Sequence, residues 1–411
     1  MAGGRRSPGA GRPASDITGN RIASVPNLSK DVLDLRPELI ALRRALHQQP
    51  ELAFAETATA ARVVSFLEGG GLDLRTSVGG TGVVATAGAG GRCVLLRVDL
   101  DALPIDEQNE VPYASRVPGR MHACGHDGHA AIGAGAARIL GRRRLAGRVR
   151  MLFQPAEEGE GGAQAVIAEG VLEGVDTVLG LHLWNELPVG TLGVKAGPLM
   201  AAVDRLRIVV HGRGGHGAQP QRAADPVVAA AHVVTALQTI VAREVSPLDS
   251  AVVTLGSIHG GQAFNVIPDE VTLTGTIRTF DAGLRRSIPE RVRRIAAGVA
   301  EGLGCRAEVE VRAGNPAVVN DAKVAEVVRR AAARVVGETN VVAPVPTMGG
   351  EDMAVYFERV PGCFVFVGSA NRERGLDQPH HSPRFDFDEE ALAIGCEFLV
   401  QAAEELLRAD G

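Results

Sequence analysis

The stretch CVLLRVDLD at residues 93–101 is an apolar run with the length of a buried strand, and it ends in two carboxylates. Similar short apolar runs recur along the chain, with helical patterns between several of them. The runs are 83–87, 93–98, 149–153, 178–183 and 364–367, and the helical stretches include 130–140, 162–168 and 323–336. Buried strands that alternate with helices predict an α/β fold with a mainly parallel sheet covered on both faces.

A second unit interrupts this pattern between about residues 201 and 314. Its expected elements are a strand (204–211), a helix (223–242), two strands (250–259 and 269–280), a helix (284–302) and a strand (307–311). This order is βαββαβ, which is typical of a ferredoxin-like α+β domain. We therefore predict a tail at 1–28, a catalytic domain in two parts at 29–200 and 316–411, and an inserted domain at 201–315.

Composition excludes several classes of protein. The chain has 411 residues, a net charge of −5 and no basic stripe, so we expect no nucleic-acid partner. No run of 18 apolar residues occurs, so we predict no transmembrane helix and no membrane partner. The first 25 or so residues are rich in Gly, Pro, Ser and Arg and lack an apolar segment, which indicates a disordered tail rather than a secretory signal. Five scattered cysteines favour a reducing compartment, and we expect the cytoplasm.

Polar residues gather where the predicted strands end. Asp99 follows the predicted strand at 93–98, and Glu157 and Glu158 follow the strand at 149–153 in FQPAEEGEGGA. His182 lies near the end of the strand at 178–183, in GLHLW. The carboxyl ends of parallel strands form the edge where ligands bind in open sheets. Taken singly, His182 could be a core histidine, and paired glutamates are common on solvated surfaces. Their shared position predicts a functional site.

The motif MHACGHDGHAA, residues 121–131, is the sharpest in the chain. It holds Cys124, His126, Asp127 and His129 within six residues. In an extended segment Cys124 and His126 share one face, and a thiolate with an imidazole suits zinc or a similar divalent metal. The alternative is a polar loop leading into a helix with Asp127 as the N-cap, and both interpretations can hold together.

Further candidates lie later in the chain. The turn QPHHSPRFDF offers His380 and His381, and spacing does not choose between them. The inserted domain carries His216 in GRGGHGAQP, Asn265 in GGQAFNVIPDE and Arg278 in GTIRTFD. Arg278 suits a substrate carboxylate. For each of these three residues a surface or turn role stays equally open.

Together the motifs resemble the hippurate hydrolase and auxin-conjugate hydrolase type of N-acyl-amino-acid amidohydrolase, in the group of dinuclear metallopeptidases that includes aminoacylases and carboxypeptidase G. The resemblance runs from about residue 35 to 399 and includes LRRALHQQPELAFAE, RVDLDALPIDE, GGHGAQP, FNVIPDE, GTIRTFD, GGEDMAVY and HSPRF. It implies two divalent metal ions per subunit (Zn, Mn, Co or Ni), a small N-acyl amino acid as substrate, and a homodimer formed through the inserted domain, which would also act as a lid.

The resemblance also implies roles for single residues. Cys124 would bridge the two metal ions, Glu157 would be the general base, and His216, often supplied by the partner subunit, would stabilise the oxyanion. Asn265 and Arg278 would bind substrate, and Asp99 would orient a ligand. The implied metal ligands are Cys124, His126, Glu158, His182 and His381.

The sequence departs from the wider group at two places. That group usually has His-x-Asp where this chain has Arg97-Val98-Asp99, although the resembled subfamily shares the arginine. Many relatives read LHxHPE, whereas this chain reads LHQQPE at residues 46–51, which predicts a changed contact near the site.

Two other functions compete with this prediction. The same chemistry could serve a dipeptidase, a carboxypeptidase or a carbamoyl-amino-acid hydrolase, but those proteins usually have Asp at the bridging position. A catalytically silent metal-binding protein would be expected to have lost Glu157 or ligands, and all of them are present.

Overall fold

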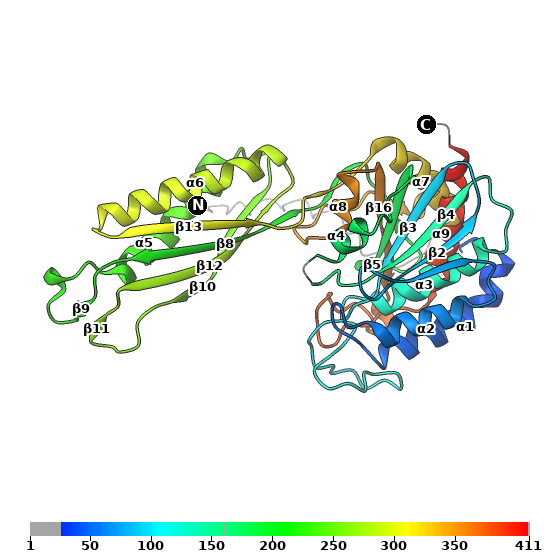
Figure 1. Cartoon of the computed structure of the whole chain (residues 1–411), viewed down its shortest axis with the longest axis horizontal. Coiled ribbons are helices and arrows are strands. Elements are labelled where there is room, and N and C mark those ends of the chain that lie inside the picture. Colours follow the sequence, from blue (N-terminus) through cyan, green and yellow to red (C-terminus); the bar gives the residue numbers. More distant parts are fainter. Residues whose placement is uncertain (1–25, 160, 410–411) are drawn as a thin grey trace, which may run out of the picture.

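The structure is a computed structural model that describes residues 26–159 and 161–409. Residues 1–25 of the predicted tail therefore lie outside the described part. Two units are visible: one is built around a large sheet with helices around it, and the other is elongated and extends to one side (Figure 1).

The large unit contains an eight-stranded sheet in the order β1-β2-β4-β3-β5-β16-β6-β15. The central strands β4, β3, β5 and β16 are parallel, as predicted, whereas β1 and β2 add an antiparallel edge. Every residue of β3 and β16 is buried, which explains why these strands are mainly apolar, apart from Arg97 and Asp99 in β3. The strands are β1 (Asp73–Val78), β2 (Gly82–Gly88), β3 (Cys93–Asp99), β4 (Arg148–Gln154), β5 (Thr177–Pro188), β6 (Leu192–Gly193), β15 (Val341–Val342) and β16 (Gly362–Ala370).

Helices cover both faces of this sheet. The larger core lies under α1 (Lys30–His47), α2 (Thr57–Leu67), α3 (His126–Leu140), α7 (Ala322–Val336) and α9 (Glu390–Arg408). A smaller core on the opposite face includes α4 (Gly162–Ala168) and α8 (Met353–Phe357). Small residues let α3 approach the sheet closely: a Cβ atom at Gly133 would lie 2.7 Å from Val98. Overpacking of such a contact costs about 1–3 kcal/mol, so glycine is favoured there.

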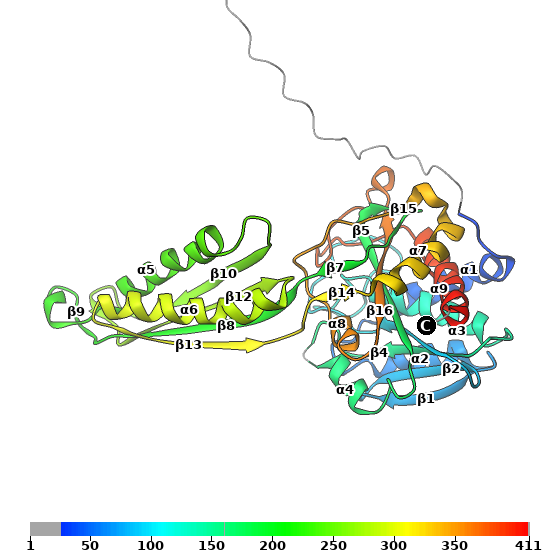
Figure 2. The same ribbon diagram turned by 90° about the horizontal axis from the view of Figure 1, so that it is seen from above.

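The second unit is a four-stranded antiparallel sheet in the order β10-β12-β8-β13, with α5 and α6 on one face. Its elements follow each other as βαββαβ, which confirms the predicted ferredoxin-like order. They are β8 (Ala202–His211), α5 (Pro226–Thr239), β10 (Ala251–His259), β12 (Glu270–Thr279), α6 (Ala282–Gly302) and β13 (Arg306–Ala313). A separate small ribbon of β9 (Gly215–His216) and β11 (Val266–Ile267) lies at the far end (Figures 1 and 2).

The chain leaves and re-enters the large unit at one place. Strands β7 (Gly197–Met200) and β14 (Val318–Asn320) pair with each other there. The N–H of Val203 donates to the carbonyl of Asn315, and the N–H of Gly314 donates to the carbonyl of Val203. The inserted unit is thus joined by two adjacent segments, while the domain limits 201–315 stay a prediction.

One helical stretch differs from the expectation that no helix could span a membrane. Among the described residues, Pro226–Glu244, which is α5 with the turn that follows it, is long and apolar enough by length and composition, with a mean hydropathy of 1.3. The prediction relied on uninterrupted apolar runs, and this stretch contains His, Thr and Gln. Its buried residues Ala229, Ala230 and Val233 belong to the core of the second unit, and 33% of the apolar window is buried, so the helix covers that core with one face.

Candidate metal centre

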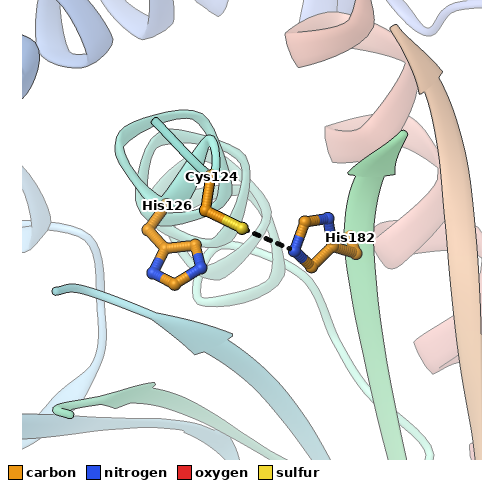
Figure 3. Close-up of side chains that lie close together, drawn as sticks. All are labelled: Cys124, His126 and His182. Carbon is orange, nitrogen blue, oxygen red and sulfur yellow. Dashed lines mark hydrogen bonds between the residues drawn. The ribbon is translucent and has the colours of Figure 1, made fainter. Parts of the chain in front are cut away.

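The candidate site lies at the carboxyl-terminal edge of the central strands. Cys124 and His126 come from the turn that begins α3, and His182 comes from β5 (Figure 3). Glu158 follows β4, and His381 lies on a turn after β16. The five residues predicted as ligands therefore come from four separate segments that the parallel sheet brings to one edge.

Cys124 is at the centre of this arrangement. Its sulfur lies 3.4 Å from Nε2 of His182 (Figure 3). The possible ligand atoms of Cys124, His126 and His182 lie within 4.8 Å of one another, and so do those of Cys124, Glu158 and His381. Because Cys124 belongs to both groups, the geometry offers two neighbouring cation positions that share one sulfur.

The two buried imidazoles present the same nitrogen to the site. Nδ1 of His126 lies 2.9 Å from the carbonyl oxygen of Asp101, and Nδ1 of His182 lies 2.6 Å from that of Leu183. Nε2 of His126 is buried and has no hydrogen-bond partner among the described residues. A buried nitrogen without a partner is costly unless something else occupies it, so these residues fit a bound metal ion.

The charge balance also fits a cation. Burial raises the pKa of the Cys124 thiol well above its usual range, and the nearby carboxylates of Glu158 and Glu157 raise it further. A coordinated transition metal reverses this balance, because it deprotonates a thiol directly. One thiolate, imidazoles and a carboxylate form a donor set that suits zinc and similar divalent ions.

Glu157 and Glu158 are adjacent but differ in their environment. Burial raises the pKa of Glu157 well above its usual range, and the negative charges of Glu351 and Glu158 add to this shift. Burial also opposes ionisation of Glu158, but the hydrogen bond with His381 and the positive field of His126 lower its pKa overall. Neighbouring carboxyl groups with opposite shifts suit two tasks, namely proton transfer for Glu157 and metal ligation for Glu158.

A third carboxylate fixes the backbone of this pair. Asp101 accepts the N–H of Glu157 at 3.0 Å and the N–H of Glu158 at 2.9 Å, one on each carboxylate oxygen. Ala156, just before them, has φ of 55°, a left-handed conformation that is rare for a residue with a Cβ atom. Its N–H donates to the buried Glu56 at 2.8 Å. These bonds hold a strained turn that directs the two glutamates toward the site.

Asp99 contacts the site through His129. Its carboxylate lies 2.6 Å from Nδ1 of His129 and accepts Nη1 of Arg97 at 2.8 Å, but it is 3.8 Å from Nδ1 of His126. His129 in turn accepts the N–H of Leu183 at 2.8 Å, next to His182. Asp99 therefore acts on the site indirectly, and Asp101 is the carboxylate that touches His126.

Asp127 is not the N-cap that the sequence allowed. Helix α3 begins at His126 after Gly125, whose φ of 90° only glycine adopts readily. The Asp127 carboxylate instead accepts Nε of Arg43 at 2.8 Å and lies 2.8 Å from Nδ1 of His47. It anchors α3 to α1 beneath the site.

The LHQQPE departure lies away from the ligands. Gln48 donates to the carbonyl of Pro112, and Gln49 accepts from Arg62. Glu51 accepts N–H groups at the start of α2. Both glutamines bond to surface groups, and none of these partners is a proposed metal ligand.

The two adjacent histidines point in different directions. Nε2 of His381 lies 2.9 Å from a carboxylate oxygen of Glu158. His380 stacks on Trp184 at 4.9 Å, and its Nε2 lies 2.9 Å from the carbonyl of Leu183. Burial lowers the pKa of His380 to about 4, so its ring stays neutral. Of the two, only His381 belongs to a group of possible ligands.

A cavity of about 660 Å³ joins this centre to the base of the inserted unit. Its wall includes Cys124, Glu157, Glu158, His182 and His381 on one side and Arg278 on the other. His216 and Asn265 are not part of that wall. They lie at the ribbon of β9 and β11 and the turn beside it, at the far end of the inserted unit (Figures 1 and 2).

The sequence profile of Peptidase family M20/M25/M40 matches residues 95–405. The chain belongs to this family. The N-acetyl-L-cysteine deacetylase of Bacillus subtilis (strain 168) is 42% identical over 396 residues, which are 95% of this chain and 94% of that protein. IAA-amino acid hydrolase ILR1-like 4 of Arabidopsis thaliana is 39% identical over 376 residues, or 90% of this chain and 86% of that protein.

A solved member of the M20 family has the same fold. The YXEP protein of Bacillus subtilis, described as a dinuclear metal-binding peptidase, matches with a TM-score of 0.80 and 39% identity, covering 92% of this chain and 99% of that chain. The predicted family, the fold class and the assignment as a metal-dependent hydrolase are thereby confirmed.

Sequence reasoning missed several residues that support the M20 site. Arg97 is fully buried, and its guanidinium contacts Glu351 at 3.1 Å and Asp352 at 2.6 Å. Possible ligand atoms of Glu157, Glu351 and Asp352 lie within 4.8 Å of one another, so this buried cluster sets the charge around Glu157. The motif GGEDMAVY was the available signal, because its two carboxylates stand in an otherwise apolar stretch.

Proposed function

We propose that this chain is a dinuclear metal-dependent amidohydrolase that cleaves N-acyl amino acids into a carboxylic acid and a free amino acid. The observation that carries the proposal is the position of Glu157. It lines one cavity with the Cys124-centred ligand groups and with Arg278 on the opposite wall. Relatives named as a deacetylase of N-acetyl-L-cysteine and as an IAA-amino acid hydrolase support a substrate of this class.

The metal ligands in this proposal are the five residues that surround the shared sulfur. His126 and His182 would hold one ion with Cys124, and Glu158 and His381 would hold the other with the same sulfur. Two such ions, which we expect to be Zn, Mn, Co or Ni, supply Lewis acidity that lowers the pKa of a water toward 7 and polarises the acyl carbonyl.

Glu157 moves the proton. Burial and the negative charges of Glu351 and Glu158 raise its pKa, which makes its carboxylate a stronger base than a solvated one. In this proposal the carboxylate accepts a proton from the attacking water and delivers it to the leaving amine.

Arg278 would bind the free carboxylate of the substrate. Its guanidinium donates to Oγ1 of Thr276 and to the carbonyl of Met348. Within the described residues no carboxylate lies within 4.0 Å of it to form an ion pair. A guanidinium that faces a cavity without an acidic partner is suited to a bidentate bond with a substrate carboxylate.

His216 and Asn265 require a second subunit if they take part. Both lie at the far end of the inserted unit from their own ligand groups, so this chain alone does not bring them to the cavity. We propose a homodimer through residues 201–315, in which the partner's His216 donates to the developing oxyanion and the partner's Asn265 holds the reacting group. One such donor is worth about 3–4 kcal/mol in the transition state.

The proposed compartment is the cytoplasm. All five cysteines are free and buried, and none of them forms a disulfide. This is the usage expected of a reducing environment.

The test is chelator-sensitive release of amine. The purified protein with added Mn or Zn would be given N-acetyl and N-benzoyl amino acids beside dipeptides. We expect release from the N-acyl amino acids, loss of release with EDTA and recovery with added metal. Release from dipeptides alone would assign the chain to the dipeptidases instead, and no release despite bound metal would contradict the proposal.

A further inference from the structure

The segment that carries His381 is an irregular turn with a strained backbone. It spans residues 378–386 after β16 and contains no helix or strand. His381 itself has φ of 65°, a left-handed conformation that is rare for a residue with a Cβ atom. Such a conformation persists only where the surrounding structure holds it in place. The groups around the 378–386 turn should therefore include its anchors.

Asn185 bonds to both ends of the 378–386 turn. Its amide nitrogen donates to the carbonyl of Gln378 at 2.9 Å and to the carbonyl of Asp386 at 2.8 Å. One of these acceptors precedes His381 in the chain and the other follows it. A single side chain thus connects the two ends of the turn.

The amide of Asn185 is fixed in the orientation that these bonds require. Asn185 lies on β5 and is buried, and its Oδ1 accepts the hydroxyl of Ser369 at 2.7 Å. Ser369 is itself buried and lies on the neighbouring strand β16. An amide whose oxygen is bonded in this way presents its two N–H groups in defined directions. The whole polar group of Asn185 therefore serves the connection to the 378–386 turn.

The two ends of the turn differ in their other bonds. Asp386 is also held through its carboxylate, which accepts Nη2 of Arg43 at 2.7 Å. For Gln378, the bond with Asn185 is the only hydrogen bond within residues 26–159 and 161–409. Loss of Asn185 should therefore release the turn at the Gln378 end, from which the chain enters it and reaches His381.

The middle of the turn is tied to the segments that carry other candidate ligands. The N–H of His381 donates to the carbonyl of Ala123, the residue before Cys124, at 2.8 Å. Nε2 of His380 donates to the carbonyl of Leu183 at 2.9 Å. A shift that begins at the released end would thus act on bonds that set the place of the His381 ring.

We propose that Asn185 is a positioning residue that holds His381 in its ligand geometry before any metal ion binds. This inference rests on the proposed metal centre, in which Glu158 and His381 hold one of the two ions. Removal of a group that holds a ligand in position typically weakens metal binding about 10–100-fold. His182 lies in the paired part of β5, so the ion that it holds with His126 should be affected less.

Three variants separate this role from a general loss of stability. Asn185→Leu removes the three bonds of the amide and keeps the approximate size of the side chain. Ser369→Ala is a milder change that removes only the bond that orients the amide. Asn320→Leu is the matched control, because Asn320 is also buried and its amide also makes three hydrogen bonds, with Lys195 and Phe364.

Hydrogen exchange of the full-length, metal-free protein measures how firmly the turn is held. In Asn185→Leu we expect amide exchange within 379–386 to become at least about tenfold faster, because the turn opens locally. Ser369→Ala should show a smaller increase in the same peptide, and Asn320→Leu should leave this peptide unchanged. Exchange as slow as in the wild type in both Asn185→Leu and Ser369→Ala overturns the proposal.

Titration of the metal-free protein with Zn, in competition with a chromophoric chelator, measures the effect on the site. Asn185→Leu should weaken one of the two ions about 10–100-fold, whereas Asn320→Leu should weaken neither. In a His381→Ala background, Asn185→Leu should cause no further loss, because the ligand that it positions is already absent. If Asn185→Leu does not fold, Ser369→Ala gives the same readouts with smaller changes.

Two results of the titration would overturn the positioning role. One is a loss of Zn affinity in the His381→Ala background that equals the loss in the wild-type background. The other is an equal loss in Asn320→Leu, because it would assign the effect to stability. If the wild type binds no Zn, the proposed metal centre fails, and hydrogen exchange alone then decides whether Asn185 holds the 378–386 turn.

Discussion

The sulfur of Cys124 and Nε2 of His182 lie 3.4 Å apart, although they come from the turn before α3 and from the middle of β5. Both atoms are buried, and the same sulfur belongs to a second group of possible ligands with Glu158 and His381. In the proposed centre one atom therefore joins the two possible cation positions, and its removal should affect both.

Replacement of Cys124 should remove metal from the protein. We expect Cys124→Ala to lower the metal content from two ions per chain to one or none, because the shared donor is lost from both positions. Elemental analysis after dialysis measures this. Cys305→Ala is the matched control, since this cysteine lies in the core of the inserted unit. Two retained ions in Cys124→Ala would contradict a bridging sulfur.

Asp101 should act on metal affinity through the backbone that it holds. Asp101→Ala removes the acceptor of two N–H groups, those of Glu157 and Glu158, and the contact with His126. Loss of such a supporting group typically weakens metal binding about 10–100-fold. Titration of the metal-free protein with Zn measures the affinity. The control is Asp106→Ala, which removes a carboxylate that accepts the N–H of Gly119. Unchanged affinity would show that Asp101 has no positioning role.

Glu157→Gln should separate metal binding from turnover. The amide keeps the size of the side chain but does not accept the proton, so kcat should fall by at least about 10²–10⁴-fold while the metal content stays unchanged. Elemental analysis and amine release on the same preparation give both values. Turnover near the wild-type level would show that another group is the base.

Subunit mixing tests the proposed role of His216. His216→Ala and Glu157→Gln should each be inactive as homodimers. In a mixed dimer one site contains an intact Glu157 and receives the partner's His216, so complete exchange should restore up to about a quarter of the wild-type activity. Activity from His216→Ala alone, or no recovery although mass measurement shows mixed dimers, would contradict a site shared between subunits.

His47 should make stability depend on pH. Burial disfavours its charged form, but the charge and hydrogen bond of Asp127 and the bond to Glu107 outweigh this and raise its pKa to about 9 against 6.5 for the free residue. A raised pKa in the folded state adds stability that is complete below pH 6.5 and is lost as the pH rises through 9. We expect the free energy of unfolding to fall by about 3 kcal/mol over this range.

Denaturant unfolding of the metal-free protein in EDTA, at several pH values between 6.5 and 9, measures this loss. His47→Gln should remove most of the slope. The exposed His232 is the control, because it bonds only to the carbonyl of Val228 in its own helix, and His232→Gln should keep the slope. An identical slope in both variants would assign the pH dependence to other groups.

The sequence predicted those strands and helices that a clear apolar pattern marks. The central strands β3, β4, β5 and β16 were predicted because each contains a buried apolar run. Strands of two residues such as β6 and β15 were not predicted, because they are too short to carry a pattern. Helix α3 begins four residues before the predicted start, since its first turn, HDGH, is polar for the sake of the site.

Residues with a choice of partner were harder to assign. Asp99 and Asp101 lie two residues apart at the end of one strand, and only the fold shows that Asp101 contacts the glutamates and His126 while Asp99 contacts His129. His380 and His381 are likewise adjacent, but His381, whose φ is 65°, contacts Glu158, whereas His380 stacks on Trp184. Sequence spacing carries no information about such turns.

The hydrogen bonds between Val203 and the segment at Gly314 and Asn315 have an evolutionary consequence. An inserted unit whose two ends lie side by side can be replaced by another domain, because the replacement leaves the connections between the strands of the large sheet unchanged. The residues proposed as metal ligands all belong to the large unit, whereas Arg278 on the opposite wall of the cavity belongs to the inserted unit. Recombination at this junction would therefore change the substrate specificity in a single genetic step and keep the same catalytic chemistry.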